Sequence, residues 1–194
     1  MSNEPPIEVV DRRLACENSK FFIYFDHVRD SAGNEVTDYL VVAPKHSGIN
    51  QVTGVAILPI VDQKVGLIRI YRPALRDYSW EIPHGFVDEG EDEVTSALRE
   101  LQEETGVVAD RQCARSLGFI TPDSGVLAAR VHLYVVEGGY LSKRMDTELG
   151  LGEVRFFDFQ AFETMIERSE VQDTFTLAAW CKYRLLQQSQ PPKS

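Results

Sequence analysis

Three glutamates near the end of one predicted helix are the residues best suited to chemistry. Glu100, Glu103 and Glu104 lie in the last turns of a helical segment that runs from Glu93 to Thr105. Like charges one turn apart repel, and carboxylates at this end of a helix oppose its macrodipole. A solvated acidic face is the ordinary interpretation of such a run. The alternative is a bound divalent cation, because Mg²⁺ prefers carboxylates, water and phosphate oxygens.

The helix that carries these glutamates has one apolar stripe. Its apolar residues recur at the i, i+3, i+4 and i+7 spacing of a buried helix face. They are Val94, Ala97, Leu98 and Leu101. Gly106 follows the last helical residue, where glycine commonly ends a helix. The glutamates therefore extend from the face opposite this stripe to its edge, beside a glycine-containing turn.

Strands are predicted on both sides of this helix. They cover residues 7–16, 20–30, 36–44, 52–62, 64–73, 80–87, 113–121, 129–138 and 153–159, and two further helices cover 159–167 and 173–186. The first three strands predict a small antiparallel β lobe over residues 1–48. The remainder, 49–194, is predicted to be one mixed domain, so the fold class is α+β.

Composition excludes several functions. The net charge of −10 and the pI near 4.9 argue against binding to nucleic acid, which depends on Lys and Arg. No stretch approaches the roughly 18 apolar residues of a membrane span, and the N-terminus lacks the apolar core of a signal peptide. The three cysteines, Cys16, Cys113 and Cys181, have no metal or disulfide spacing. We expect a cytoplasmic protein with neither nucleic-acid nor membrane partners.

The segment GFVDEGEDEVTSALRELQEETGV, from Gly85 to Val107, resembles the Nudix box. Every fixed position of that motif is present: Gly85, Glu91, Arg99, Glu100, Leu101, Glu103, Glu104, Gly106 and Val107. Nine constrained positions within 23 residues make a specific signal. The resemblance implies the Nudix fold, with mixed β-sheets sandwiched between helices. It also implies a Mg²⁺-dependent pyrophosphohydrolase, with Mn²⁺ as the alternative metal.

The resemblance assigns roles within and beside the box. It implies that Glu100 and Glu104 are the main metal ligands, with Glu103 close by as a ligand and catalytic residue. The main-chain carbonyl of His84 is a further expected ligand. The remaining motif residues are expected to be structural: Gly85, Glu91, Arg99 and Gly106. Among these, Arg99 and Glu91 would form an ion pair that fixes the loop and orients the glutamates.

A general base outside the box is expected in the loop SKRMDTELGLG, residues 142–152. Glu148 is favoured because it lies in a glycine-containing segment before a strand, where ADP-ribose hydrolases of the family carry a comparable acid. Asp146, Glu153 and a glutamate of the box are the alternatives. An ordinary solvated loop glutamate explains Glu148 equally well.

The segment YRPALRDYSWEIPHG, residues 71–85, resembles the region before the box in ADP-ribose and nucleotide-sugar pyrophosphatases. Trp80 and Glu81 would stack on and hydrogen-bond a base, and Arg72 would reach the diphosphate. Pro122 follows Gly106 by sixteen residues, at the spacing of the ADP-ribose group, although a turn explains a proline equally well. The expected substrate is ADP-ribose, cleaved to AMP and ribose 5-phosphate.

One departure leaves the substrate open. Many ADP-ribose enzymes have a Pro-Gly pair and then an acid, whereas this chain has Asp123-Ser124-Gly125 and no acid from Val126 to Val136. GDP-mannose or another nucleoside diphosphate sugar is therefore an alternative substrate. A catalytically silent nucleotide-binding Nudix module is a third hypothesis, which the intact glutamates disfavour.

The predicted N-terminal lobe has an apolar strand at its centre. Alternation places Phe22 and Tyr24 on one face and Phe21, Ile23 and Phe25 on the other. Rings in a core are the simpler interpretation, and a base-stacking platform is the alternative. A lobe this small hardly covers two apolar faces alone. In relatives this lobe pairs two subunits, so the resemblance implies a homodimer.

Overall fold

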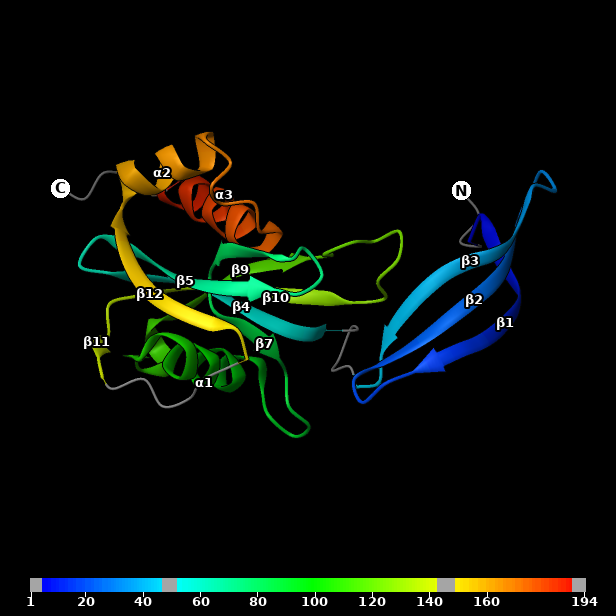
Figure 1. Ribbon diagram of the computed structural model, residues 1–194, viewed down its shortest axis with the longest axis horizontal. Coiled ribbons are helices and arrows are strands. Elements are labelled where there is room, and N and C mark those ends of the chain that lie inside the picture. The colour runs from blue at the N-terminus through cyan, green and yellow to red at the C-terminus, as the bar shows by residue number, and fades with distance from the viewer. Residues whose placement is uncertain (1–4, 47–51, 143–148, 190–194) are drawn as a thin grey trace. The chain divides into compact units, whose positions relative to one another are not determined.

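The computed structural model describes residues 5–46, 52–142 and 149–189. The chain forms two compact units. The first comprises Met1–Thr53 and Thr121–Arg130, and the second comprises Gly54–Ile120 and Val131–Ser194. Figure 1 labels most of the helices and strands of both units.

The first unit contains a three-stranded antiparallel sheet. Its strands, in spatial order, are β1 (Ile7–Glu17), β2 (Phe21–Asp30) and β3 (Glu35–Pro44). Segment 121–130 adds to this unit, because the amide of Val42 on β3 donates to the carbonyl of Val126 over 2.8 Å. The small antiparallel N-terminal sheet expected from the sequence is therefore confirmed.

A seven-stranded sheet forms the body of the second unit. Its main order is β12 (Leu151–Asp158), β5 (Lys64–Arg72), β4 (Val52–Val61), β10 (Arg130–Glu137) and β9 (Ala114–Ile120). Off this path, β6 (Asp77–Glu81) pairs with β5 and β7 (His84–Phe86) pairs with β4. A separate pair consists of β8 (Val107–Val108) and β11 (Tyr140–Leu141). Every residue of β4 is buried, as suits a central strand.

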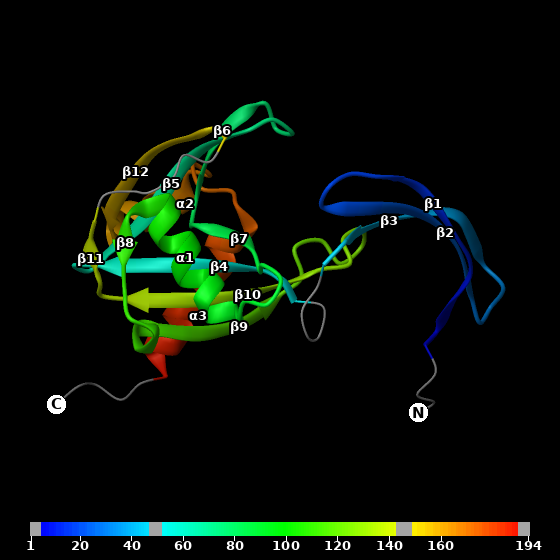
Figure 2. The same cartoon turned by 90° about the horizontal axis from the view of Figure 1, so that it is seen from below.

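Helices cover both faces of this sheet (Figures 1 and 2). They are α1 (Glu93–Thr105) on one face and α2 (Phe159–Glu167) and α3 (Thr174–Gln188) on the other. Alternate residues of β4 divide between the layers: Ile57 packs with Leu101 of α1, and Leu58 packs in the cluster that contains Phe162 of α2. This sandwich confirms the expected α+β class.

Residues 80–87, predicted as a short strand entering a turn, contain the end of one strand and a second short strand in the structure. β6 ends at Glu81 and β7 begins at His84, so the chain leaves β5 and joins β4. Pro83 has no amide hydrogen for a sheet ladder, and its carbonyl accepts from the amide of Ile57 over 2.9 Å. The crossing places His84 beside the central strand.

The helices agree closely with the sequence prediction. Both α1 and α2 have the predicted bounds, and α3 begins one residue later and ends two residues later than predicted. The side chain of Asp173 caps α3 by accepting from the amide of Thr176 over 2.8 Å. Within the described ranges, no helix is long and apolar enough to cross a membrane.

Candidate active site

Both ends of α1 are held by specific contacts. Asp92 caps the first turn by accepting from the amide of Thr95 over 3.3 Å, and Arg111 Nη2 donates to Asp92 Oδ1 over 2.6 Å. The hydrogen bond from Arg111 is the main cause that holds the pKa of Asp92 well below its ordinary value, and hydrogen bonds from Thr95 add to this effect. At the other end Gly106 has a φ of 77°, and its amide donates to Gln102. The position of the glutamate-bearing turns is thereby fixed.

The three box glutamates differ in exposure. Glu104 is only 4% exposed, and its Oε2 accepts from the main-chain amide of His84 over 3.0 Å. The side chains of Glu100 and Glu103 are 13% and 34% exposed. The last turn of α1 contains no basic residue, so the macrodipole adds to the negative charge here. The structure thus places a buried carboxylate and two partly exposed ones at one end of α1.

Arg99 is the cation that organises this cluster. Its Nη1 donates to Glu100 Oε1 over 2.8 Å and to Glu103 Oε2 over 3.1 Å, and its Nε donates to Glu91 Oε2 over 3.3 Å. Burial lowers the pKa of the Arg99 guanidinium, but the charges of Glu100 and Glu103 outweigh that effect and raise it. One planar guanidinium therefore links the loop before α1 to the end of the helix.

Gly85 leaves room for the Glu100 carboxylate. A Cβ atom at this position would lie 2.1 Å from Glu100 Oε1, far inside van der Waals contact. Gly85 pairs with Val55 in the ladder between β7 and β4. Any side chain on this residue would displace the carboxylate, so the invariant glycine of the motif has a steric role here.

The oxygen atoms gathered at this end of α1 suit a hard divalent cation. Carboxylates of Glu100, Glu103 and Glu104 and the main-chain oxygen of His84 are the donor types that Mg²⁺ takes. Among the residues that the structure describes, no set of three or more His, Cys, Asp and Glu side chains is grouped to hold an ion alone. Mg²⁺ usually binds one or two protein carboxylates and completes its shell with water and substrate phosphates, so this donor set fits it.

A second network joins the upstream segment to this cluster. Arg72 Nη2 lies 2.5 Å from Glu81 Oε2 and 3.0 Å from His84 Nε2, and His84 Nδ1 lies 2.9 Å from the carbonyl of Ile82. A carbonyl only accepts, so Nδ1 carries the proton and Nε2 of the neutral ring accepts from Arg72. Burial raises the pKa of Glu81, but the Arg72 hydrogen bond helps to lower it overall. Glu81 is therefore an ion-pair partner of Arg72.

Trp80 lies on the opposite face of β6 from Glu81. Trp80 pairs with Arg69 of β5, and its ring meets Phe157 edge-on at a centroid distance of 5.3 Å. The guanidinium of Arg155 lies 6.0 Å from the Trp80 ring. Because alternate residues of a strand face opposite sides, Trp80 and Glu81 point to opposite sides of β6.

The remaining candidate residues lie in several parts of the chain. Pro122 belongs to the first unit, whereas Arg72, Trp80 and Glu81 belong to the second. Glu153 lies on β12, where Arg155 Nε is 2.7 Å from one of its carboxylate oxygens. Glu148, the favoured general base, lies outside the described residues.

One contact between α3 and this site was not predicted from the sequence. The ring of Phe175 on α3 packs edge-on against the His84 ring at a centroid distance of 5.0 Å. Nothing local in the sequence marks this contact, because the two residues are brought together only by the docking of α3 on the sheet.

Comparison with known proteins identifies the class. The NUDIX domain family matches residues 50–180. The chain is also similar to the methanol dehydrogenase activator of Bacillus methanolicus, with 38% identity over 105 residues, which cover 54% of each protein. It is similar to the ADP-ribose pyrophosphatase of Bacillus subtilis (strain 168), with 30% identity over 138 residues, which cover 70% of this chain and 71% of that protein.

The chain therefore belongs to the NUDIX domain family, and the resemblance seen in its sequence is confirmed. It spans about half the length of the activator that it matches. The crystal structure of an ADP compounds hydrolase has the same fold, with a TM-score of 0.79 and 19% identity over 100% of both chains.

Proposed function

We propose that this chain is a Mg²⁺-dependent pyrophosphohydrolase that cleaves the diphosphate of ADP-ribose to AMP and ribose 5-phosphate. The observation that carries the proposal is the buried carboxylate of Glu104 on the His84 amide, beside Glu100 and Glu103 on Arg99. Holding like charges together costs free energy, which a bound cation offsets. The similarity to a Bacillus subtilis ADP-ribose pyrophosphatase supports the substrate.

Each residue has a proposed role. Glu100, Glu104 and the main-chain carbonyl of His84 hold Mg²⁺, with Glu103 beside them. When bound, the ion neutralises the diphosphate and lowers the pKa of the attacking water. Glu148 would accept a proton from the attacking water as general base. Arg72, held by Glu81 and His84, donates to a phosphate oxygen.

A substrate panel tests this proposal. Purified protein with Mg²⁺ is expected to release AMP and ribose 5-phosphate from ADP-ribose. Chromatography of the products measures this release. Chelation with EDTA is expected to abolish release, and added Mg²⁺ or Mn²⁺ to restore it. Tight binding of ADP-ribose without release of either product would instead indicate a silent nucleotide-binding module.

A second substrate class is favoured by one feature. The segment Asp123-Ser124-Gly125 replaces the Pro-Gly pair and acid that many ADP-ribose enzymes carry, so another nucleoside diphosphate sugar is the alternative. GDP-mannose belongs in the same panel. Turnover of GDP-mannose without turnover of ADP-ribose would establish this alternative.

We also propose that the protein is a cytoplasmic homodimer that pairs through its first unit. Several apolar side chains of β1 and β3 are exposed, among them Ile7 at 53%, Leu14 at 51% and Val36 at 47%. The aromatic rings of β2 are only partly buried within the single chain. Light scattering is expected to give twice the chain mass, and Leu14→Asp to shift the protein towards monomer. A monomeric wild-type protein would contradict this.

A further inference from the structure

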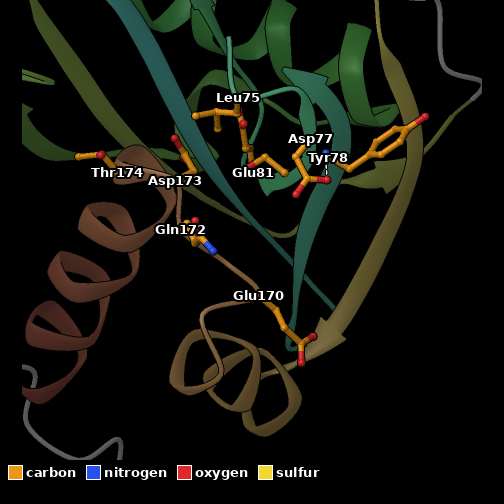
Figure 3. A pocket seen from close by; sticks show the side chains of 9 residues that line it. Leu75, Asp77, Tyr78, Glu81, Glu170, Gln172, Asp173 and Thr174 are labelled. Atoms are coloured by element: carbon orange, nitrogen blue, oxygen red, sulfur yellow. Dashed lines mark hydrogen bonds between the residues drawn. The ribbon is translucent and has the colours of Figure 1, made fainter. Parts of the chain in front are cut away.

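A pocket of about 550 Å³ lies between β6 and the segment that joins α2 to α3 (Figure 3). Its volume falls within the range of sites for small molecules, about 300–1,000 Å³. Oxygen-bearing side chains line it, among them Asp77, Ser79, Glu81, Glu170, Asp173 and Thr174. No lysine, arginine or histidine belongs to its lining within the described part of the chain. The pocket thus offers many hydrogen-bond acceptors and no cation of its own.

Two walls of this pocket connect to the candidate active site. On the β6 wall, Glu81 is held by Arg72, and the same Arg72 nitrogen contacts His84, whose amide binds Glu104. On the α3 wall, Asp173 and Thr174 precede Phe175, whose ring packs on that of His84. The pocket therefore borders Arg72 and His84, the same residues that link β6 and α3 to Glu104.

The charge and the hydrogen-bonding capacity of the pocket lining determine which chemical group of a substrate can bind there. An ionised carboxylate only accepts hydrogen bonds and has about four lone-pair sites, so Asp173 keeps acceptor capacity beyond its cap on α3. Sugar hydroxyls donate to such acceptors, whereas phosphate or carboxylate groups would be repelled by Asp77, Glu170 and Asp173.

We propose that this pocket binds the uncharged distal sugar of a nucleoside diphosphate sugar and rejects substrates whose distal group is anionic. The inference rests on the proposed pyrophosphohydrolase function and adds its specificity. Asp77 and Glu170 are the specificity-determining residues best suited to a test, because both are exposed and neither caps a helix.

The test compares ADP-ribose with ADP-ribose 1″-phosphate, which differ only at the distal sugar. Wild-type kcat/KM is expected to favour ADP-ribose by about 100-fold or more, since like charges placed together in a binding site oppose binding. The double variant Asp77→Asn with Glu170→Gln is expected to narrow that ratio by about tenfold. Glu167→Gln, an exposed acid outside the pocket lining, is the matched control and should leave the ratio unchanged.

The outcomes separate the two proposals. Cleavage of ADP-ribose with an equal ratio in wild type and double variant would overturn the pocket assignment alone. Absence of any cleavage would overturn the proposed function, and calorimetric titration with the same two nucleotides would then test the pocket. In that titration, a higher affinity for ADP-ribose than for its 1″-phosphate, with a smaller difference in the double variant, would support the pocket assignment. Equal affinities, or no detectable binding of either nucleotide, would overturn it.

Discussion

The main-chain amide of His84 donates to the buried carboxylate of Glu104 over 3.0 Å, so β7 holds the end of α1 through a charged acceptor. On the next residue, Gly85 lies against the carboxylate of Glu100. Two adjacent residues of β7 thus position two glutamates that α1 presents one turn apart. The arrangement makes the chemistry of α1 depend on the strand beside it.

Glu104→Gln is expected to lower kcat/KM by about 100-fold or more, because even residues that only orient metal ligands typically contribute about 10- to 100-fold. The fold should survive, since the amide oxygen of glutamine still accepts from His84. Steady-state kinetics with Mg²⁺ and thermal unfolding check both parts. Activity near that of wild type would refute the metal assignment.

Gly85→Ala is expected to displace the Glu100 carboxylate and to lower both Mg²⁺ affinity and kcat/KM by about tenfold. The new Cβ would overlap Glu100 Oε1, which lies at 2.1 Å from its position. Gly125→Ala is the control, because its nearest neighbour would lie at an ordinary 3.4 Å. Calorimetric Mg²⁺ titration distinguishes the variants, and equal affinities in both would contradict the steric argument.

Arg99→Lys is expected to lower the free energy of unfolding by about 1–2 kcal/mol, since an ammonium cannot replace the forked contacts to Glu91, Glu100 and Glu103. The control is Arg111→Lys, in which both partners of the Asp92 ion pair are more than half exposed. Such an exposed pair contributes about 0–1 kcal/mol. Urea unfolding measures the difference, and equal losses would argue against a special role for Arg99.

Alkaline stability is expected to depend on Tyr183. Its hydroxyl donates to Glu137 over 3.0 Å, and burial together with the Glu137 charge raises the pKa of Tyr183 to about 12 from an ordinary 10.0. A raised pKa in the folded state means that protonated Tyr183 stabilises the fold below pH 10 and that this stabilisation is lost as pH rises towards 12. Urea unfolding from pH 8 to 11.5 should show a steeper decline for wild type than for Tyr183→Phe. If the free energy of unfolding fell equally in both proteins over this pH range, Tyr183 would not be the cause of the alkaline loss of stability.

Local signals predicted the element that carries the chemistry. The extent of α1 was predicted from the apolar stripe within it and from Gly106 after it, both of which are read within a few residues. A turn was predicted within residues 80–87, but β7 and its pairing with β4 were not, because that pairing depends on a partner strand distant in the sequence. Trp80 and Glu81 are adjacent on β6 and point to opposite sides of it, so base binding by the two residues stays a prediction.

The sequence by itself determined the family and the glutamate-bearing helix, because motif spacing and helical periodicity are properties of nearby residues. Only the tertiary structure decided that Glu104 is buried on His84, that Arg72 is held between Glu81 and His84, and that α3 helps to line a pocket beside them. Those contacts join segments distant in the chain, and they exist only once the sheet and its two helical layers have packed.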